Sequence, residues 1–453
     1  MHITLFQPRY PHGKSQCYLP GGLMNLGSRL LNAGVEVSFF DLNFSNLDSR
    51  EVTKQLATSD LIGFSVLGHP YIPEAIENLK TLRKQHSLQD ILVGGEGIAR
   101  LQEADFQQWF GELDNVFQIK NDDDLRARLW NNPVVSAFKT SMAPMLTRLS
   151  EPMRRVYLTS EFALFISNGC KFGCAFCEAA KGIPEQYRTR DSLRAEVEYI
   201  CVYLKSIGHP RLEVYLSNLD AFQNPKELEP RVAIVGETCR KYGITSHIRC
   251  LATSRCTVQA IRADPELPQR LHAHGLRIVA FGADGADEET WKREKKTHNK
   301  LAEIHEAVIT MQNADILVEL LMVIGFQQDK PKALWHDVKF SFREAYRGAV
   351  IRPYLGKSRT PSAPDRWESG QKEVEACRKD PNLLLSLDFA MIASKVSHPS
   401  CKERWLSTLA YLLIIGVLAP FGLCPTRPLV PIPQKGIGKW LAQTVNRFMP
   451  FDR

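Results

Sequence analysis

The sequence has few of the features that mark a secreted, repetitive or nucleic-acid-binding protein. It shows no internal repeat of fixed period and no low-complexity tract. Its 11 cysteines are scattered over 453 residues and do not form a dense disulfide module. A formal net charge of +7 is small for this length, so we expect no nucleic-acid partner. With 44% hydrophobic and 24% charged residues, the chain has the composition of a globular protein with a sizeable core.

The N-terminus also lacks a secretion signal. Residues Met1–Phe6 read as a strand and do not form a basic segment followed by a long apolar one. We therefore expect a cytoplasmic location, where the environment is reducing. In that setting, closely spaced cysteines indicate metal or redox chemistry and not disulfide bonds.

Short apolar runs alternate with helical patterns over the first 130 residues. Strands of a parallel sheet are buried on both faces and read as continuous apolar runs, with helices between them. This pattern predicts an α/β, Rossmann-like domain over residues 1–130. Its expected strands are Ile3–Gln7, Val35–Asp41, Leu61–Val66 and Ile91–Val93, and its expected helices include Leu23–Ala33 and Pro73–Gln85.

A second strand–helix series begins after a proline-containing linker at residues 131–157. Six strand–helix units over residues 158–360 are too many for a small sheet and predict a partial (β/α)6 barrel. The composition then changes again, and residues 361–453 are expected to form a mostly helical C-terminal extension. The expected barrel strands are Ala163–Ser167, Leu212–Leu216, Ser246–Leu251, Arg277–Phe281, Leu317–Val323 and Ala349–Arg352.

The strongest chemical signal is a cysteine triplet directly after the first of these strands. Cys170, Cys174 and Cys177 are spaced by four and three residues, and Gly169 and Gly173 allow the backbone to bend tightly around a bulky ligand. Thiolates are the ligands that iron–sulfur clusters require. A 4Fe–4S cluster held by three cysteines keeps one iron open for a small molecule. We predict such a cluster at this triplet.

Two other interpretations of the triplet remain open. A zinc site normally has a fourth cysteine or histidine within a few residues, and none follows before Cys201. Three unrelated thiols at this spacing, between glycines and after a barrel strand, would be a coincidence. A non-catalytic iron–sulfur or zinc protein is therefore kept as an alternative of a different functional class.

The Cys-x-x-x-Cys-x-aromatic-Cys pattern at the end of a first barrel strand resembles the radical S-adenosylmethionine superfamily. The resemblance implies that the open iron binds the amino and carboxylate groups of S-adenosylmethionine, which is cleaved reductively to methionine and a 5′-deoxyadenosyl radical. It also implies an external electron donor such as flavodoxin or ferredoxin. Phe176 occupies the aromatic position, which in the family lies beside the adenine.

Later segments resemble the cofactor-binding segments of this superfamily, in the same order. Ser217 and Asn218 follow the strand at which the family binds the methionyl amine, although the usual Gly-Gly-Glu run is absent. Asp284 lies in a segment that is similar to the Gly-x-Glu-Ser after the fourth strand. Gly325 and Phe326 begin a segment that is similar to the Gly-Phe-Pro-Gly-Glu after the fifth strand. The resemblance implies that these residues contribute to the cofactor site.

Several polar residues of the barrel have an alternative structural interpretation. Asp284 and Asp329 could be helix N-caps, which strand-to-helix turns favour. Asp220, close behind Asn218, has no certain role. Arg249 could lie on a barrel strand and face a carboxylate, or it could form a structural ion pair.

Residues 1–130 resemble the cobalamin-binding domain that precedes the barrel in the cobalamin-dependent methylase-like subgroup. The run Asp60–Ser65 and the Val-Gly-Gly turn match the subgroup pattern, and Gly94 and Gly95 allow close backbone approach to a flat ligand or its tail. The Asp-x-His-x-x-Gly run that supplies a histidine ligand to cobalt is absent. Relatives without this run can still bind cobalamin, and some have lost cobalamin altogether. We expect cobalamin bound without a histidine lower ligand, with a domain that has lost cobalamin as the alternative. His12 and His69 are conceivable ligands, although solvated or capping loop histidines explain them as well.

The C-terminal extension contains one long apolar run. Leu406–Leu423 has no charged residue and would form a helix about 27 Å long, just short of a ~30 Å hydrocarbon core. The tail Gly438–Arg453 interleaves apolar and basic residues, as interfacial helices do. Residues 405–453 could therefore contact a membrane peripherally, or the apolar run could be a buried helix that closes the barrel mouth.

Together these patterns favour a radical S-adenosylmethionine enzyme that acts on a small-molecule or peptide substrate. The resemblance of the N-terminal domain implies methylation of an unactivated carbon, with methylcobalamin as the methyl donor. A radical enzyme that performs rearrangement, cyclisation or sulfur chemistry is the first alternative.

Overall fold

The computed structural model describes residues 1–9, 19–66, 72–85, 89–99, 101, 103–129, 136–175, 177, 182–326, 329–355 and 401–424. These residues fall into two compact units. The first unit contains Met1–Ala163 and Arg188–His209, and the second contains Leu164–Tyr187 and the described residues from Pro210 onward. The chain therefore leaves the first unit, returns to it, and leaves it again.

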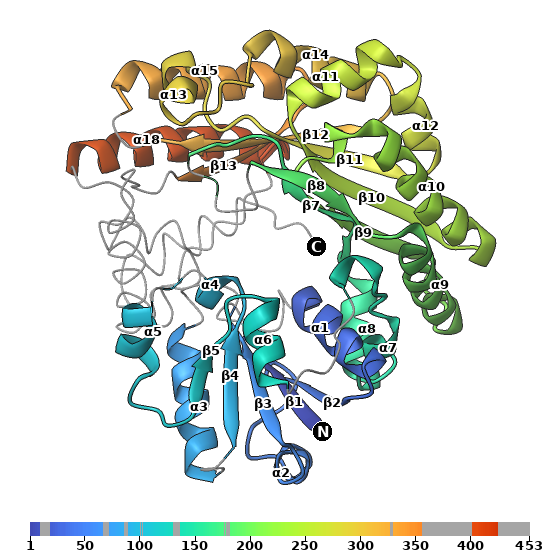
Figure 1. Ribbon diagram of the computed structural model, residues 1–453. Helices are drawn as coiled ribbons and strands as arrows, with labels where there is room; N and C mark the ends of the chain where they lie inside the picture. Colours follow the sequence, from blue (N-terminus) through green and yellow to red (C-terminus); the bar gives the residue numbers. More distant parts are fainter. Residues whose placement is uncertain are drawn as a thin grey trace. The chain divides into compact units, whose positions relative to one another are not determined.

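The core of the first unit is a five-stranded parallel sheet in the order β2-β1-β3-β4-β5 (Figure 1). Every residue of β1 and β3 is buried, as expected for strands covered on both faces. The Rossmann-like fold predicted for this part of the chain is confirmed. The strands are β1 (His2–Gln7), β2 (Glu36–Asp41), β3 (Leu61–Ser65), β4 (Asp90–Gly94) and β5 (Val116–Gln118). The helices are α1 (Gly21–Asn32), α2 (Arg50–Leu56), α3 (Ile72–Gln85), α4 (Glu96–Ala99), α5 (Glu103–Phe110) and α6 (Asp122–Arg128).

The segment that follows is more helical than the sequence pattern predicts. A 3-10 turn, η3 (Ala137–Lys139), precedes α7 (Ala143–Leu146) and α8 (Glu151–Thr159). Pro144 and Pro152 lie in the first turns of α7 and α8. A proline there removes an N–H that has no partner within the helix, so it starts a helix and does not interrupt one.

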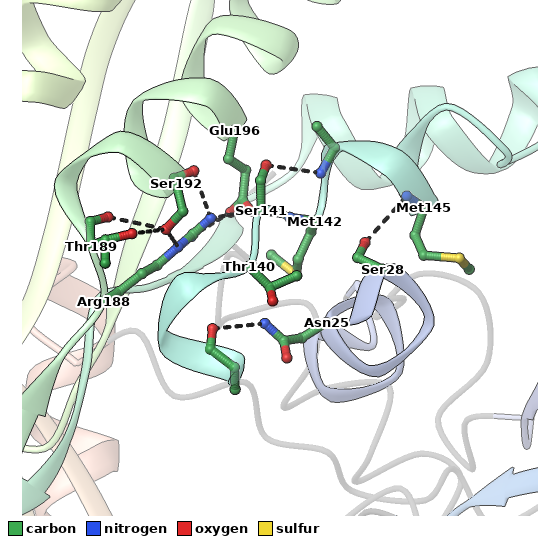
Figure 2. A network of polar contacts seen from close by, with 12 residues as sticks. Asn25, Ser28, Thr140, Ser141, Met142, Met145, Arg188, Thr189, Ser192 and Glu196 are labelled. Carbon is green, nitrogen blue, oxygen red and sulfur yellow. Dashed lines mark hydrogen bonds and ion pairs between the residues drawn. The ribbon is translucent and has the colours of Figure 1, made fainter. Parts of the chain in front are cut away.

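A buried polar network joins this segment to α9 (Arg190–Ser206) within the first unit (Figure 2). The guanidinium of Arg188 donates to both carboxylate oxygens of Glu196, at 3.0 and 2.7 Å. Their side chains are 1% and 0% exposed. The backbone N–H of Met142 donates to the same carboxylate at 2.6 Å, and α7, which begins next to Met142, packs against α1. The network therefore fixes α9 to the first unit.

The second unit contains a six-stranded sheet in the order β13-β12-β11-β10-β9-β6 and an antiparallel pair, β7–β8 (Figure 1). The pairs from β9 to β13 are parallel, and the spatial order follows the chain order. This is the predicted partial barrel. Its strands are β6 (Phe162–Phe165), β7 (Ser167–Cys170), β8 (Ile183–Tyr187), β9 (Arg211–Ser217), β10 (Thr245–Ala252), β11 (Leu276–Gly282), β12 (Leu317–Ile324) and β13 (Val350–Leu355). Its helices are α10 (Pro225–Tyr242), α11 (Ser254–Ala263), α12 (Leu267–Ala273), α13 (Glu288–Arg293), α14 (Leu301–Gln312) and α15 (Pro331–Tyr346).

The two faces of this sheet differ in what covers them. On β10, Ile248 and Cys250 are fully buried, and α10 packs against this strand on the outer face. His247, Arg249 and Leu251 alternate with them and are only half-buried. Because successive side chains of a strand point to opposite faces, these three lie on the inner face. Loops that follow the strands gather at one edge of the sheet, so the inner face and this edge are where a site can form.

The apolar C-terminal run begins within α18 (Cys401–Leu418). α18 packs against α15 and the edge strand β13, and the N–H of Ile351 donates to the carbonyl of Leu423 at 2.8 Å. Among the described residues, no helix combines the length and the hydropathy of a membrane-spanning segment. The tail 438–453 lies outside the described residues, so peripheral membrane contact through 405–453 stays a prediction. The other face of α18 is apolar and exposed at Leu409, Leu412, Leu413 and Val417.

Candidate functional site

The cysteine loop starts at the end of β7, where a glycine is required. Gly169 has φ +109°, and a Cβ there would lie 2.6 Å from the carbonyl oxygen of Pro184 on β8. Only glycine accommodates both the conformation and the close approach of the two strands. The loop that follows is held in place from outside, because the N–H of Ala175 donates to the carbonyl of Glu294 at 2.8 Å. The N–H of Lys171 donates to the side chain of Gln223 at 2.7 Å.

The three thiols of this loop lie within electrostatic reach of one another. Burial raises the pKa of Cys170, and negative charge on Cys174 and Cys177 raises it further. Burial also raises the pKa of Cys174, whereas the ammonium of Lys296 lowers it. A strongly cationic metal centre would favour three thiolates at such a site.

The donor set suits a cluster. Within the described ranges, no three His, Cys, Asp or Glu side chains converge on one point as the ligands of a single ion do. Three cysteines that bind a cubane each take a different iron, so their sulfur atoms do not need to converge in that way. Cys170, Cys174 and Cys177 therefore fit a 4Fe–4S group with one iron left open.

A buried ion pair lies beside the cysteine loop. Lys296 and Asp284 form a salt bridge, and their residues are 5% and 9% exposed. A Cβ on Gly282, the last residue of β11, would lie 3.0 Å from the Asp284 carboxylate and 3.1 Å from the Lys296 ammonium. The pair therefore lies at the C-terminal end of β11. Because Lys296 interacts electrostatically with Cys174, the pair also lies beside the predicted cluster site.

Asp284 caps no helix in this structure. The N-cap of α13 is Asp287, whose carboxylate accepts from the N–H of Thr290 at 3.0 Å. Asp284 itself has φ +48°, a left-handed conformation that aspartate tolerates better than most residues. Asp329 is not the N-cap of α15 either, because it accepts from the N–H of Phe326 at 2.8 Å and so closes the turn after β12.

His298 also contacts the cysteine loop. Its ring stacks on Phe172 of the cysteine loop, with centroids 3.9 Å apart and an interplanar angle of 20°. Burial, followed by the positive charge of Lys296, lowers the pKa of His298 to about 3. The ring is therefore neutral near pH 7. Neither Lys296 nor His298 was expected from the sequence, because the segment around them is rich in charge and resembles a solvated surface.

The polar residues after β9 form hydrogen bonds with other residues of the chain. The amide of Asn218 fits its surroundings when Nδ2 donates to the carbonyl of Leu216 at 3.0 Å and Oδ1 accepts from the N–H of Ala221 at 2.7 Å. Ser217, the last residue of β9, lies directly before it. Asp220 is fully buried and accepts from the N–H and hydroxyl of Thr253, at 3.1 and 2.8 Å.

These contacts give Asp220 a structural role, since they tie the end of β9 to the start of α11. Burial raises the pKa of this carboxyl, and the hydrogen bonds from Thr253 lower it.

The turn after β12 reaches the same edge of the sheet. Gly325 has φ +76°, and Phe326 is buried at 5% exposure. A Cβ on Gly285 would lie 3.9 Å from the ring of Phe326, so this ring packs next to the segment that carries Asp284. Phe176 lies outside the described residues, and its expected place beside an adenine stays a prediction.

The predicted glycine turn of the first unit is closely packed. Gly95 has φ +101°, and a Cβ there would lie 2.6 Å from the carbonyl oxygen of Val66. Gly94 ends β4, and its carbonyl accepts from the N–H of Val66 at 2.8 Å. The turn thus needs glycine to let the ends of β3 and β4 approach each other. His12 and His69 lie outside the described residues.

Comparisons with known proteins identify the fold. No family model matches the chain, and no curated protein matches it in sequence. A solved structure of the cobalamin-dependent S-adenosylmethionine radical enzyme OxsB, with aqua-cobalamin bound, has a TM-score of 0.63 at 12% identity and covers 98% of this chain and 75% of that one. The chain has the fold of cobalamin-dependent radical S-adenosylmethionine enzymes.

A second solved structure supports the same assignment of fold. It is the radical S-adenosylmethionine methyltransferase TsrM from Kitasatospora setae, with cobalamin and a [4Fe–4S] cluster bound. Its TM-score is 0.59 at 16% identity, and the match covers 78% of this chain and 75% of that one. The fold and the cysteine motif thus agree with the resemblance to the radical S-adenosylmethionine superfamily.

Proposed function

We propose that this protein is a radical S-adenosylmethionine enzyme that holds a 4Fe–4S cluster through Cys170, Cys174 and Cys177. One observation carries the proposal. Three cysteines lie in a single loop after β7, in a chain whose fold matches TsrM and OxsB. The cysteine motif is recognised from the sequence and the fold from the structure, so these two lines of support are independent.

The residues around the loop would bind and shield the cofactors. When bound, the cluster supplies the electron that cleaves the sulfonium of S-adenosylmethionine, and cobalamin supplies a methyl group. The stacked rings of Phe172 and His298 cover one side of the cysteine loop, and the neutral imidazole adds no charge there. Phe326 packs at the same edge and would exclude water. The ammonium of Lys296, which is paired with Asp284, would favour the thiolate form of Cys174.

The reaction that we propose is cobalamin-dependent methylation of an unactivated carbon. Support comes from the extent of the OxsB match, which covers 98% of the chain and so includes the Rossmann-like unit. The substrate would be a small molecule or a peptide, and an external donor such as flavodoxin or ferredoxin would provide electrons. A reducing, cytoplasmic location suits a loop whose cysteines would act as thiolate ligands.

Reductive cleavage of S-adenosylmethionine is the first test of this proposal. Protein reconstituted with iron and sulfide under anaerobic conditions, then reduced, should form 5′-deoxyadenosine from S-adenosylmethionine, even slowly without substrate. Liquid chromatography of the reaction measures the product. Cys174→Ala should remove the activity, whereas Cys239→Ala, at a buried cysteine of α10, should retain it.

A negative result would have a clear meaning. If neither 5′-deoxyadenosine nor S-adenosylhomocysteine forms with any reductant, even with candidate substrates present, a non-catalytic iron–sulfur protein becomes the better description.

Cobalamin binding is the second test. The intact protein should bind hydroxocobalamin with a dissociation constant below ~100 μM, an affinity of about 5–6 kcal/mol. Gly95→Val should weaken binding, because its Cβ would collide with the carbonyl of Val66. Gly34→Val is the matched control, since Gly34 also has positive φ but has open space around it. Equilibrium dialysis with absorption spectra measures binding. No binding to the intact wild-type protein would favour the non-methylating radical enzyme.

A further inference from the structure

The segment between α13 and α14 carries a buried charge that lies against the cysteine loop. The carbonyl of Glu294 accepts from the N–H of Ala175 at 2.8 Å. Four residues later, the ring of His298 stacks on Phe172, with centroids 3.9 Å apart. Lys296 lies between these two contacts in the sequence and is only 5% exposed. The segment therefore brings a buried ammonium to the same stretch of the cysteine loop.

The ion pair of Lys296 and Asp284 has its positive end towards the cysteines. Burial raises the pKa of Cys174 most, but the ammonium of Lys296 then lowers it by more than the carboxylate of Asp284 raises it. Burial lowers the pKa of Lys296, and the charges of its carboxylate partner, of Cys174 and of Cys177 raise it by more. Lys296 therefore stays an ammonium ion beside these thiols.

Solvent does little to screen the charges of this pair. Asp284 is only 9% exposed, and Lys296 is still less exposed. Buried charges interact at a lower effective dielectric constant than exposed ones, which water and salt screen. The neutral imidazole of His298 adds no charge on this side of the loop. The field of the pair thus acts on the cysteine loop at close to its full strength.

A buried cation at this place acts on the electron that a cluster must accept. In the proposed function, three thiolates already make the cluster anionic, and reduction adds one further negative charge. Nearby charge and exposure to solvent are among the factors that set the reduction potential of an iron–sulfur cluster. The ammonium of Lys296 would stabilise the reduced form relative to the oxidised form, and the carboxylate of Asp284 would do the opposite.

We propose that the buried ion pair sets the reduction potential of the cluster, with Lys296 raising it and Asp284 lowering it. The inference rests on the proposed function for the cluster itself. One electron passes from the external donor to the cluster, and the pair changes only how readily the cluster accepts it. A pair that merely braces the end of β11 against the cysteine loop predicts no such opposite effects of the two residues.

The test is a redox titration of the reconstituted protein without S-adenosylmethionine and without cobalamin. Electron paramagnetic resonance measures the reduced cluster at each solution potential. In Lys296→Met, the ratio of reduced to oxidised cluster at a fixed potential should fall about tenfold, a shift of about 59 mV for a one-electron couple. In Asp284→Asn the same ratio should rise, because only the negative charge is removed. Asparagine has nearly the same shape and also tolerates the left-handed backbone of this position, so this variant should fold.

Two further variants separate charge from structure. Lys292→Met is the matched control, because Lys292 is exposed on α13, where solvent screens its charge, and its loss should leave the potential unchanged. The double variant Lys296→Met, Asp284→Asn removes both charges, and its potential should lie between those of the two single variants. The iron content of each variant is measured first, so that potentials are compared only between clusters of the same composition.

The signs of the shifts decide between the two roles of the pair. Opposite shifts in Lys296→Met and Asp284→Asn, with no shift in Lys292→Met, support the proposal. An unchanged potential in Asp284→Asn, shifts of the same sign in both single variants, or an equal shift in Lys292→Met overturns it. If the potentials shift as expected but S-adenosylmethionine is never cleaved, the inference stands and the proposed function fails. A wild type that binds no iron overturns both.

Discussion

Replacing Cys170, Cys174 and Cys177 together by alanine is expected to remove all cluster iron from the reconstituted protein. The wild type should contain about four irons per chain and show the broad brown absorption of a 4Fe–4S cluster. Thiolates are the protein ligands of the cluster, so the triple variant has nothing in this loop to bind iron. Iron analysis and the absorption spectrum after anaerobic reconstitution measure the loss.

The control for this experiment uses cysteines outside the loop. Cys201 on α9 and Cys239 on α10 are buried outside the loop, and their double replacement by alanine should leave the iron content unchanged. A full cluster in the triple variant would show that other residues hold it. Loss of iron in the control would show that iron content follows fold stability and not this loop.

Arg188→Met should lower the free energy of unfolding of the first unit by about 3–5 kcal/mol, the range for a buried ion pair that loses one partner. The carboxylate of Glu196 would remain fully buried, with the N–H of Met142 still donating to it. The double variant Arg188→Met, Glu196→Leu removes both charges and should recover much of this loss. Urea denaturation, followed by circular dichroism, gives the unfolding free energies.

An exposed pair provides the comparison. Arg262→Met breaks the contact with Glu306 on the surface, where solvent screens ion pairs, so the free energy of unfolding should change far less than in Arg188→Met. If Arg188→Met and Arg262→Met have equal effects, the network of Figure 2 does not stabilise the first unit.

The sequence predicted the parts of the fold that depend on continuous apolar runs. The predicted bounds of β1, β3 and the strands from β9 to β12 agree with the structure to within one residue, and β13 ends three residues later than predicted; buried parallel strands are recognisable because they need such runs. β5 was missed, since it has three half-buried residues and offers no run to recognise. The prolines of residues 131–157 predict an irregular linker, but Pro144 and Pro152 lie in the first turns of α7 and α8.

The sequence predicts the part of the candidate site in which the spacing of cysteines indicates metal binding. The three cysteines are close in sequence, and a local loop brings them together. Lys296 and His298 could not be found in this way, because their contacts with the cysteine loop are formed by the tertiary fold. Arg249 forms an ion pair within the barrel sheet, which is the structural alternative for this residue, and its partner Glu319 and the second arginine at 352 are visible only in the folded sheet.

The return of the chain to the first unit has a consequence for synthesis on the ribosome. Residues 188–209 belong to that unit, and Glu196 is needed by Arg188 and by the N–H of Met142. The unit cannot be completed until the chain has been made as far as His209. By then the nascent chain already contains residues 164–187, with all three cysteines of the loop. These thiols therefore emerge before either unit is complete, at a stage when neither fold can shield them from oxygen or from stray metal ions.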